Sequence, residues 1–364
     1  MRHDAARCQL CPRALQLKKG CDNSMKALFI GGTGTISTAI SALCVQQGWE
    51  LYLLNRGNRS AFVPEGAHVI TADMGDEAAV QEKLAGMTFD VVAEFIAFTR
   101  PQVERDVRLF AGKTKQYFFI SSASAYQKPL ASPVITESTP LANPFWQYSR
   151  DKIDCEDCLM QHYRQSGFPV TIIRPSHTYG DTSVPLAVRG SKGSFSVVER
   201  IRQGKKVIVP GDGTSLWTLT HNTDFAKAFC GLMGNVHAIG ETYQIMSDES
   251  LTWNQVYQAI GTALGVKPNL VHIASETLAA ANADLVGELI GDKANSVVFD
   301  NTKIKRAVPG FVAGVRFDQG VRRTLDYLYA HPELQVPDPE FDAWTDAVIR
   351  QYETMMLGLP KLHA

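Results

Sequence analysis

Residues 26–40 read KALFIGGTGTISTAI, and this stretch decides the fold. The apolar run at 27–30 is typical of a central strand in a parallel sheet. The glycine-rich turn at 31–34 then reverses the chain with almost no side chain in the way. Backbone N–H groups can therefore approach a pyrophosphate held at the N-terminus of the next helix. An ordinary strand-to-helix connection is the alternative, but the order of strand, turn and helix favours a dinucleotide site.

The composition indicates a globular protein. The chain has 364 residues, of which 45% are hydrophobic and 20% are charged, so we expect one large domain or two unequal ones. The sequence shows no membrane-spanning run and no secretory signal, which predicts a cytoplasmic protein. The formal net charge of the chain is −1. Residues 1–24 carry five basic and two acidic side chains, so residues 25–364 have a net charge of −4. This balance argues against a nucleic-acid partner, although a local basic patch is still allowed.

The cysteine pattern argues against a disulfide framework, because the chain has seven cysteines, an odd number. Cys8, Cys11 and Cys21 lie in the basic leader, where no fourth ligand stands at finger-like spacing, so we predict no metal site. Residues 1–24 are expected to be a disordered leader. Cys155 and Cys158 fall in a helical pattern, and we interpret them as packing residues.

Strands and helices alternate after the glycine turn. We expect a helix at 36–47, then strands at 50–54, 67–72, 89–95, 116–120 and 168–174, with a crossover helix that includes 105–110. This alternation predicts an α/β fold with a doubly wound parallel (Rossmann) sheet. Further on the alternation weakens, which predicts a smaller mixed α/β substrate domain with helices near 197–203, 222–233 and 252–264 and strands at 207–209 and 242–246.

These patterns divide the chain into four parts. The predicted dinucleotide-binding core covers 25–175, and a substrate-binding lid covers 176–335, with some segments returning to the core. A C-terminal helix is expected within 336–364.

The end of the second strand bears on the choice of cofactor. An acidic residue there hydrogen-bonds the adenosine ribose of NAD, whereas an arginine accommodates the 2′-phosphate of NADP. This chain has Asn55, Arg56 and Arg59 and no acid, so NADP is favoured and NAD is the alternative. Asp73 and Met74 follow the third strand, where an adenine would lie. The predicted cofactor-binding set is Gly31, Thr33, Gly34, Thr35, Ile36, Asn55, Arg56, Arg59, Asp73, Met74, Phe95, Ile96, Ala97, Tyr148, Lys152 and Pro175.

A Tyr-x-x-x-Lys pair follows the fifth strand. Tyr148 and Lys152 stand four residues apart at the head of a helix, so the phenol and the ammonium face the same side. A neighbouring cation lowers the pKa of a phenol, which suits proton exchange near neutral pH. A serine hydroxyl at the end of the strand can hold the substrate oxygen. A surface helix is the alternative for such a pair taken alone.

Together these motifs resemble the extended short-chain dehydrogenase/reductase family, of the NAD-dependent epimerase/dehydratase type. The resemblance covers residues 25–329 and rests on the motifs GGTGTI at 31–36, SS at 121–122 before Tyr126, Tyr148 with Lys152, RP at 174–175 with YG at 179–180, GDG at 211–213 with His221 and Asp224, GETYQI at 240–245 and LTW at 251–253. It implies that Tyr148 is the acid/base, that Lys152 lowers its pKa and holds the nicotinamide ribose, and that Ser122 binds the reacting oxygen. Ser124 would line the pocket.

Departures from the family pattern bear on the substrate. Ser37 replaces the third glycine, His177 replaces a substrate-binding asparagine, and Trp217 replaces an arginine that clamps the diphosphate of a sugar nucleotide. Tryptophan cannot imitate that bidentate contact, so a UDP-sugar is disfavoured. Alternatively, Arg189 or Lys192 takes over the role. The 4,6-dehydratase Asp-Glu pair is also missing, since Ala123 and Ser124 stand there, which argues against elimination of water.

We therefore expect an NAD(P)-dependent oxidoreductase or epimerase that acts at a hydroxyl or carbonyl carbon of a sugar-like small molecule. Ser124, His177 and Trp217 are the predicted substrate contacts. The indole would offer an apolar face to a sugar ring and the imidazole one donor or acceptor, unless both point away from the cleft. No membrane partner is expected, and a homodimer is allowed. Two alternatives stay open: an RNA-binding protein similar to chloroplast stem-loop-binding proteins, and a non-catalytic NADP sensor.

Overall fold

The computed structural model describes residues 24–360, and a seven-stranded sheet is its centre. All neighbouring strands are parallel, in the order β11-β7-β5-β4-β1-β2-β3. The strands are β1 (Lys26–Ile30), β2 (Glu50–Asn55), β3 (His68–Thr71), β4 (Phe89–Glu94), β5 (Thr114–Ile120), β7 (Val170–Arg174) and β11 (Thr242–Gln244). The order reverses at β1, so the carboxyl ends of β1 and β4 flank the crevice where such sheets bind ligands.

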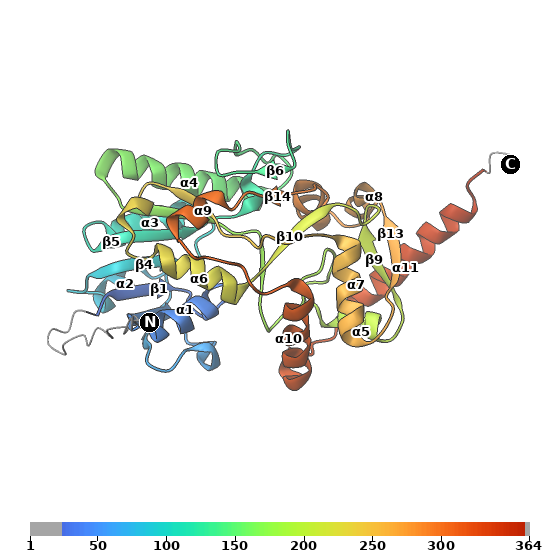
Figure 1. Ribbon diagram of the computed structural model, residues 1–364, viewed down its shortest axis with the longest axis horizontal. Helices are drawn as coiled ribbons and strands as arrows, with labels where there is room; N and C mark the ends of the chain where they lie inside the picture. The colour runs from blue at the N-terminus through green and yellow to red at the C-terminus, as the bar shows by residue number, and fades with distance from the viewer. Residues whose placement is uncertain (1–23, 361–364) are drawn as a thin grey trace, which may run out of the picture.

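Helices cover both faces of this sheet (Figure 1). In β1, Ala27 and Phe29 pack on the side of α1 (Ser37–Gln46) and α6 (Asn222–Leu232). Leu28 and Ile30 pack on the other side. That second layer is formed by α2 (Glu77–Lys83), α3 (Arg100–Phe110) and α4 (Gln147–Ser166). Burial on both faces explains why β1 is an unbroken apolar run. The predicted α/β doubly wound parallel sheet is thus confirmed.

A second core lies beyond the carboxyl ends of the strands (Figure 1). It is built from a three-stranded sheet, a two-stranded sheet and the helices around them. Its strands are β8 (His177–Tyr179), β10 (Leu216–His221), β12 (Ser250–Thr252), β9 (Lys206–Pro210) and β13 (Asn269–Ile273). Its helices are α5 (Phe195–Arg202), α7 (Trp253–Leu264), α8 (Ser275–Ala281), α10 (Phe317–Ala330), α11 (Pro339–Leu357) and a π-helix, η4 (Val286–Lys293).

Several segments return to the core. The strand β14 (Val298–Phe299) pairs in parallel with β6 (Val134–Ile135), and α9 (Thr302–Ala307) packs through Ile304 on the α1–α6 side of the sheet. The helix α11 is tied to the second core, since Asp346 pairs with the Arg200 guanidinium. The proposed domain boundaries remain a prediction.

Some elements differ from expectation. The strand expected at 242–246 ends at Gln244, and His177 to Tyr179, for which no strand was expected, form β8, which pairs with β10. The buried thiols of Cys155 and Cys158 lie in the packed layer around α4, as predicted. Cys8, Cys11 and Cys21 fall outside the described residues. No helix within residues 24–360 is both long and apolar enough to cross a membrane.

Candidate active site

The glycine turn between β1 and α1 is packed tightly on one side. Gly31 has a φ of 80°, and a Cβ there would lie 2.4 Å from Cγ2 of Ile96, so only glycine fits. Ser37, which stands where the family has a third glycine, closes the turn. Its hydroxyl donates to the Gly31 carbonyl and accepts from the Gly34 N–H, both over 2.8 Å. The serine therefore substitutes for the glycine with two added hydrogen bonds.

A cavity of about 560 Å³ begins at this turn and runs along the carboxyl ends of β1, β2 and β3. Most of the predicted adenosine and phosphate contacts line it, namely Gly31, Thr33, Gly34, Asn55, Arg56, Arg59, Asp73, Met74 and Ile96. Sequence reasoning missed other lining residues, among them Asn58, Gly75, Phe98, Gln102 and Arg105. The last three lie on or before α3, where no motif marks them.

The β2 end of this cavity is basic. Arg56 and Arg59 are exposed, and neither forms an ion pair within the described part of the chain. The Arg59 guanidinium lies 4.6 Å from the centre of the Phe62 ring. Asn55 accepts a hydrogen bond from Gly57 N–H over 2.8 Å, which shapes the turn that presents both arginines. Two cations without counter-charges are suited to bind a phosphate.

A second cavity, of about 470 Å³, adjoins the first, and Phe98 lines both. Five predicted cofactor residues line this second cavity instead, namely Ile36, Phe95, Tyr148, Lys152 and Pro175. Thr35 and Ala97 line neither cavity. The carbonyl of Thr35 accepts from the Asn222 amide over 2.9 Å, and the carbonyl of Ala97 accepts from the Lys152 ammonium.

Lys152 is held rigidly at the junction of the cavities. It is 2% exposed, and its ammonium donates to the carbonyls of Ala97 and Ile120, each over 2.7 Å. An ammonium has three protons, so one donor remains for a ligand. The nitrogen also lies 4.6 Å from the centre of the Phe98 ring and 5.8 Å from that of Tyr148. Burial lowers the pKa of Lys152 to about 8.

The pKa of Tyr148 differs from the expectation. The sequence predicts that Lys152 lowers it, but burial raises the pKa of Tyr148 and prevails over a lowering contribution from the Ser122 hydroxyl. Asp292 adds a further upward contribution. Burial of the phenol is the largest of these effects, and it outweighs the lowering expected from the Lys152 ammonium, which lies 5.8 Å from the centre of the Tyr148 ring. As arranged here, the phenol is a proton donor at neutral pH.

A chain of hydroxyl groups orients Ser122. The Asn143 amide donates to Ser149 over 3.3 Å, and the Ser149 hydroxyl donates to that of Ser124 over 2.8 Å. Ser124 lies 2.8 Å from Ser122, and its N–H also donates to the Ser122 oxygen over 3.1 Å. Either hydroxyl of the Ser122–Ser124 pair can be the donor, and Ser124, which accepts from Ser149, can place its own proton on Ser122. The Ser122 proton is then free to point toward Tyr148 or a substrate.

The three predicted substrate residues, Ser124, His177 and Trp217, all line the second cavity. Burial, with additional contributions from Lys293 and Arg189, lowers the pKa of His177 to about 3, so its imidazole is neutral at physiological pH. Trp217 is 3% exposed and stacks on Trp253 at 5.8 Å between ring centres, so it both packs and lines the cavity.

The two basic residues that could replace the missing diphosphate-binding arginine, Arg189 and Lys192, lie in different places. Arg189 lines the second cavity, whereas Lys192 does not and donates its backbone N–H to Asp338 over 3.3 Å. Arg189 therefore stays an alternative for that role, and Lys192 does not.

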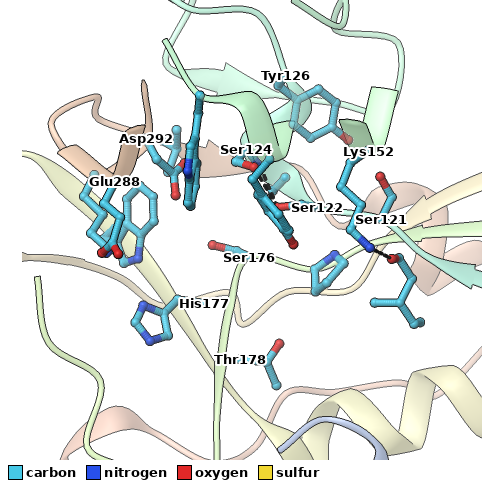
Figure 2. Close-up of a pocket in the computed structure, with 18 of the residues that line it drawn as sticks. Ser121, Ser122, Ser124, Tyr126, Lys152, Ser176, His177, Thr178, Glu288 and Asp292 are labelled. Atoms are coloured by element: carbon cyan, nitrogen blue, oxygen red, sulfur yellow. Dashed lines mark hydrogen bonds and ion pairs between the residues drawn. The ribbon is translucent and has the colours of Figure 1, made fainter. Parts of the chain in front are cut away.

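Sequence reasoning missed the charged wall of this cavity. Glu288, Asp292 and Lys293 come from η4, and Lys128 comes from the loop after β5. Figure 2 shows Glu288 and Asp292 on the side of the cavity opposite Lys152. No local pattern could have identified these residues, because a π-helix far along the chain brings three of them to this cavity. Among residues 24–360 no cluster of His, Cys, Asp and Glu has the arrangement of a metal site.

Comparisons with known proteins agree with this fold. The model of the NAD dependent epimerase/dehydratase family matches residues 107–245. The solved structure of the UDP-glucose 4-epimerase of Thermus thermophilus in complex with NAD is similar, with a TM-score of 0.64 and 21% identity, over 84% of this chain and 99% of that one.

Three curated relatives have different activities. The 2′-dehydrokanamycin reductase of Streptomyces kanamyceticus is 23% identical over 80% of this chain and 81% of its own. The chloroplast stem-loop binding protein of 41 kDa b of Arabidopsis thaliana is 27% identical over 68% of this chain and 65% of its own. The N-acetyl-alpha-D-glucosaminyl-diphospho-ditrans,octacis-undecaprenol 4-epimerase of Escherichia coli O157:H7 is 25% identical over 84% of this chain and 95% of its own. Residues 107–245 thus match the model of the NAD dependent epimerase/dehydratase family, and the chain shares the fold of the solved epimerase structure.

Proposed function

We propose that the protein is an NADP-preferring oxidoreductase or epimerase that acts on a hydroxyl or carbonyl carbon of a sugar-like small molecule, with Tyr148 as its acid/base. One observation carries the proposal. Tyr148, Lys152 and Ser122 line a single cavity, and that cavity shares Phe98 with the cavity that begins at the glycine turn. A dinucleotide that lies along both cavities would end beside the tyrosine and the lysine.

The residues present fit such a cofactor. Cavities of about 560 Å³ and 470 Å³ fall within the range typical of small-molecule sites. The glycine turn offers backbone close to a pyrophosphate, and Arg56 and Arg59 are free to take a 2′-phosphate. When bound, the nicotinamide supplies hydride transfer. Lys152, with one donor left, would hold the ribose next to it.

Side chains at this site would donate and accept the proton that accompanies hydride transfer. Ser122, whose oxygen accepts from Ser124 N–H, has a hydroxyl proton that it would donate to a substrate oxygen. Tyr148 would give a proton to that oxygen during reduction and take it back during oxidation. Ala123 and Ser124 provide neither the acid nor the base that elimination of water requires, so dehydration is not part of the proposal.

The substrate is proposed to be a sugar or polyol without a nucleotide handle. Trp217 lines the cavity with an apolar indole and cannot clamp a diphosphate as an arginine does. The reductase and the epimerase among the relatives support a sugar-like substrate.

Nicotinamide absorbance tests the proposal directly. The purified chain would be incubated with NADP⁺ or NADPH and a set of sugars, sugar nucleotides and their keto forms. Turnover of at least one non-nucleotide sugar, lost in Tyr148→Phe, is expected. If the folded chain binds neither NADP nor NAD by calorimetry, the proposal fails.

RNA binding is the second candidate, because one relative is a chloroplast stem-loop binding protein. The sequence opposes it with a net charge of −1 and an intact Tyr148–Lys152 pair. A filter-binding titration with a stem-loop RNA at 150 mM salt separates the two. Saturable RNA binding without any nicotinamide turnover would favour this candidate.

A further inference from the structure

Lys128 is a buried lysine without a partner. It lines the second cavity, is 4% exposed, and its ammonium forms no hydrogen bond or ion pair with the residues that the structure describes. Its only resolved charge interaction is a through-space attraction to Asp292. An ammonium removed from water is costly unless something replaces that water. The ammonium of the neighbouring Lys293 does have a partner, because it forms an ion pair with Glu288 at 2.6 Å.

Asp292 is a charged side chain of the opposite sign that also lacks a hydrogen-bond partner among the described residues. It lines the same cavity, and its carboxylate accepts no hydrogen bond within residues 24–360. The attraction between the two side chains does not bring them into direct contact. A group that joined them would have to accept from an ammonium and donate to a carboxylate. A hydroxyl group does both, whereas a carboxylate would be repelled by Asp292 and an ammonium by Lys128.

We propose that Lys128 and Asp292 together bind a hydroxyl group of an uncharged sugar or polyol, and that the pair selects against charged sugars in this cavity, because Asp292 repels anionic sugars and Lys128 repels cationic ones. The inference rests on the proposed function, since it assigns the second cavity to the substrate. The two charges balance each other, which suits a neutral ligand. Asp292 lies across the cavity from Lys152 (Figure 2), so this subsite would hold the end of the substrate away from the cofactor.

Thermal unfolding distinguishes a ligand-binding lysine from a structural one. Lys128→Met keeps the stem and removes the charge, and combining it with Asp292→Asn removes both unpaired charges. We expect the double variant to melt higher than the unmodified chain, on the order of 2 °C or more. Lys293→Met, which breaks an ion pair in the same cavity, should not melt higher. A clear fall in Tm for the double variant would mean that the two charges support the fold, and would overturn the proposal.

Sugar binding tests the selection. D-galactose, D-mannose and myo-inositol would be titrated against the full chain with saturating NADP⁺, with D-galacturonate and D-galactosamine as charged counterparts, and followed by tryptophan fluorescence. At least one neutral sugar should bind, more tightly than its charged counterparts. Lys128→Met should weaken it roughly 10-fold or more, as expected for loss of a charge-assisted hydrogen bond. Lys267→Met, an exposed lysine that also precedes a proline, is the matched control and should change nothing.

Three results would contradict the selection: binding of no neutral sugar, tighter binding of galacturonate that disappears in Lys128→Met, or equal affinity in Lys128→Met. These failures differ from a failure of the proposed function. With NADP still bound and Tyr148→Phe still inactive, they reject only the Lys128 subsite.

Discussion

The hydroxyl of Ser149 donates to that of Ser124 over 2.8 Å, and Ser124 in turn lies 2.8 Å from Ser122, so the three hydroxyls form one hydrogen-bonded chain. Ser149 follows Tyr148 in α4, so the helix that carries the proposed acid/base also orients the serine that would bind the reacting oxygen. The arrangement makes Ser149 a positioning residue, with no contact to substrate of its own.

Ser149→Ala should lower kcat roughly 5-fold to 10-fold, because loss of one hydrogen bond of about 1 kcal/mol lets the Ser124 proton turn away from Ser122. The affinity for NADP should not change. Ser149→Thr keeps a hydroxyl and should restore most of the rate. Ser166→Ala, at the far end of the same helix, is the control. Equal kcat in Ser149→Ala and the control would show that the hydroxyl chain does not matter for the reaction.

Arg56→Ala should weaken NADP binding roughly 10-fold or more and leave NAD binding nearly unchanged, because only the 2′-phosphate needs the guanidinium. Calorimetry with both dinucleotides measures this, and NAD serves as the internal control. A tighter affinity of the unmodified chain for NAD than for NADP would refute the preference while leaving the dinucleotide site intact.

His177 predicts that the folded chain loses stability as the pH falls below neutral. Its pKa is lowered to about 3 in the folded chain, below the ordinary value of about 6.5. Between these two pH values the unfolded chain binds more protons, so the free energy of unfolding falls as pH decreases from 6.5 toward 3. His177→Gln removes this contribution, and the difference in Tm between pH 7 and pH 4.5 should shrink. An unchanged difference would mean that the imidazole is not held in its neutral form.

Trp217 predicts that UDP is not a ligand. UDP should cause no saturable heat in calorimetry at concentrations up to 1 mM, a level at which weak ligands still register. Trp217→Arg should leave cofactor binding intact, since the indole lies in the second cavity. Saturable UDP binding that competes with substrate would return the chain to the nucleotide-sugar enzymes and point to Arg189 as the clamp.

Local patterns sufficed to predict the sheet, the glycine turn and the Tyr148–Lys152 pair, because each depends on residues close together in sequence. They did not suffice for the charged wall of the second cavity. Lys128 and Asp292 are separated by more than 160 positions, and a π-helix without a sequence signature presents the aspartate.

Two other features of the site also depend on the folded chain. The upward shift of the Tyr148 pKa depends on how completely packing removes water from the phenol, which residue spacing cannot reveal. Likewise, the sequence shows that Ser37 replaces a glycine, but it does not show that the serine hydroxyl reaches both Gly31 and Gly34. Such contacts depend on side-chain direction within the folded turn.

The most direct test of the account compares Tyr148→Phe with the unmodified chain in two measurements on the same samples, the NADP dissociation constant and the turnover of whichever sugar the absorbance screen identifies. Phenylalanine keeps the ring and removes only the proton-exchanging hydroxyl. We predict an unchanged dissociation constant and a turnover reduced roughly 10²-fold to 10⁴-fold. Turnover equal to that of the unmodified chain, with NADP bound equally well, would contradict the assignment of Tyr148 as the acid/base.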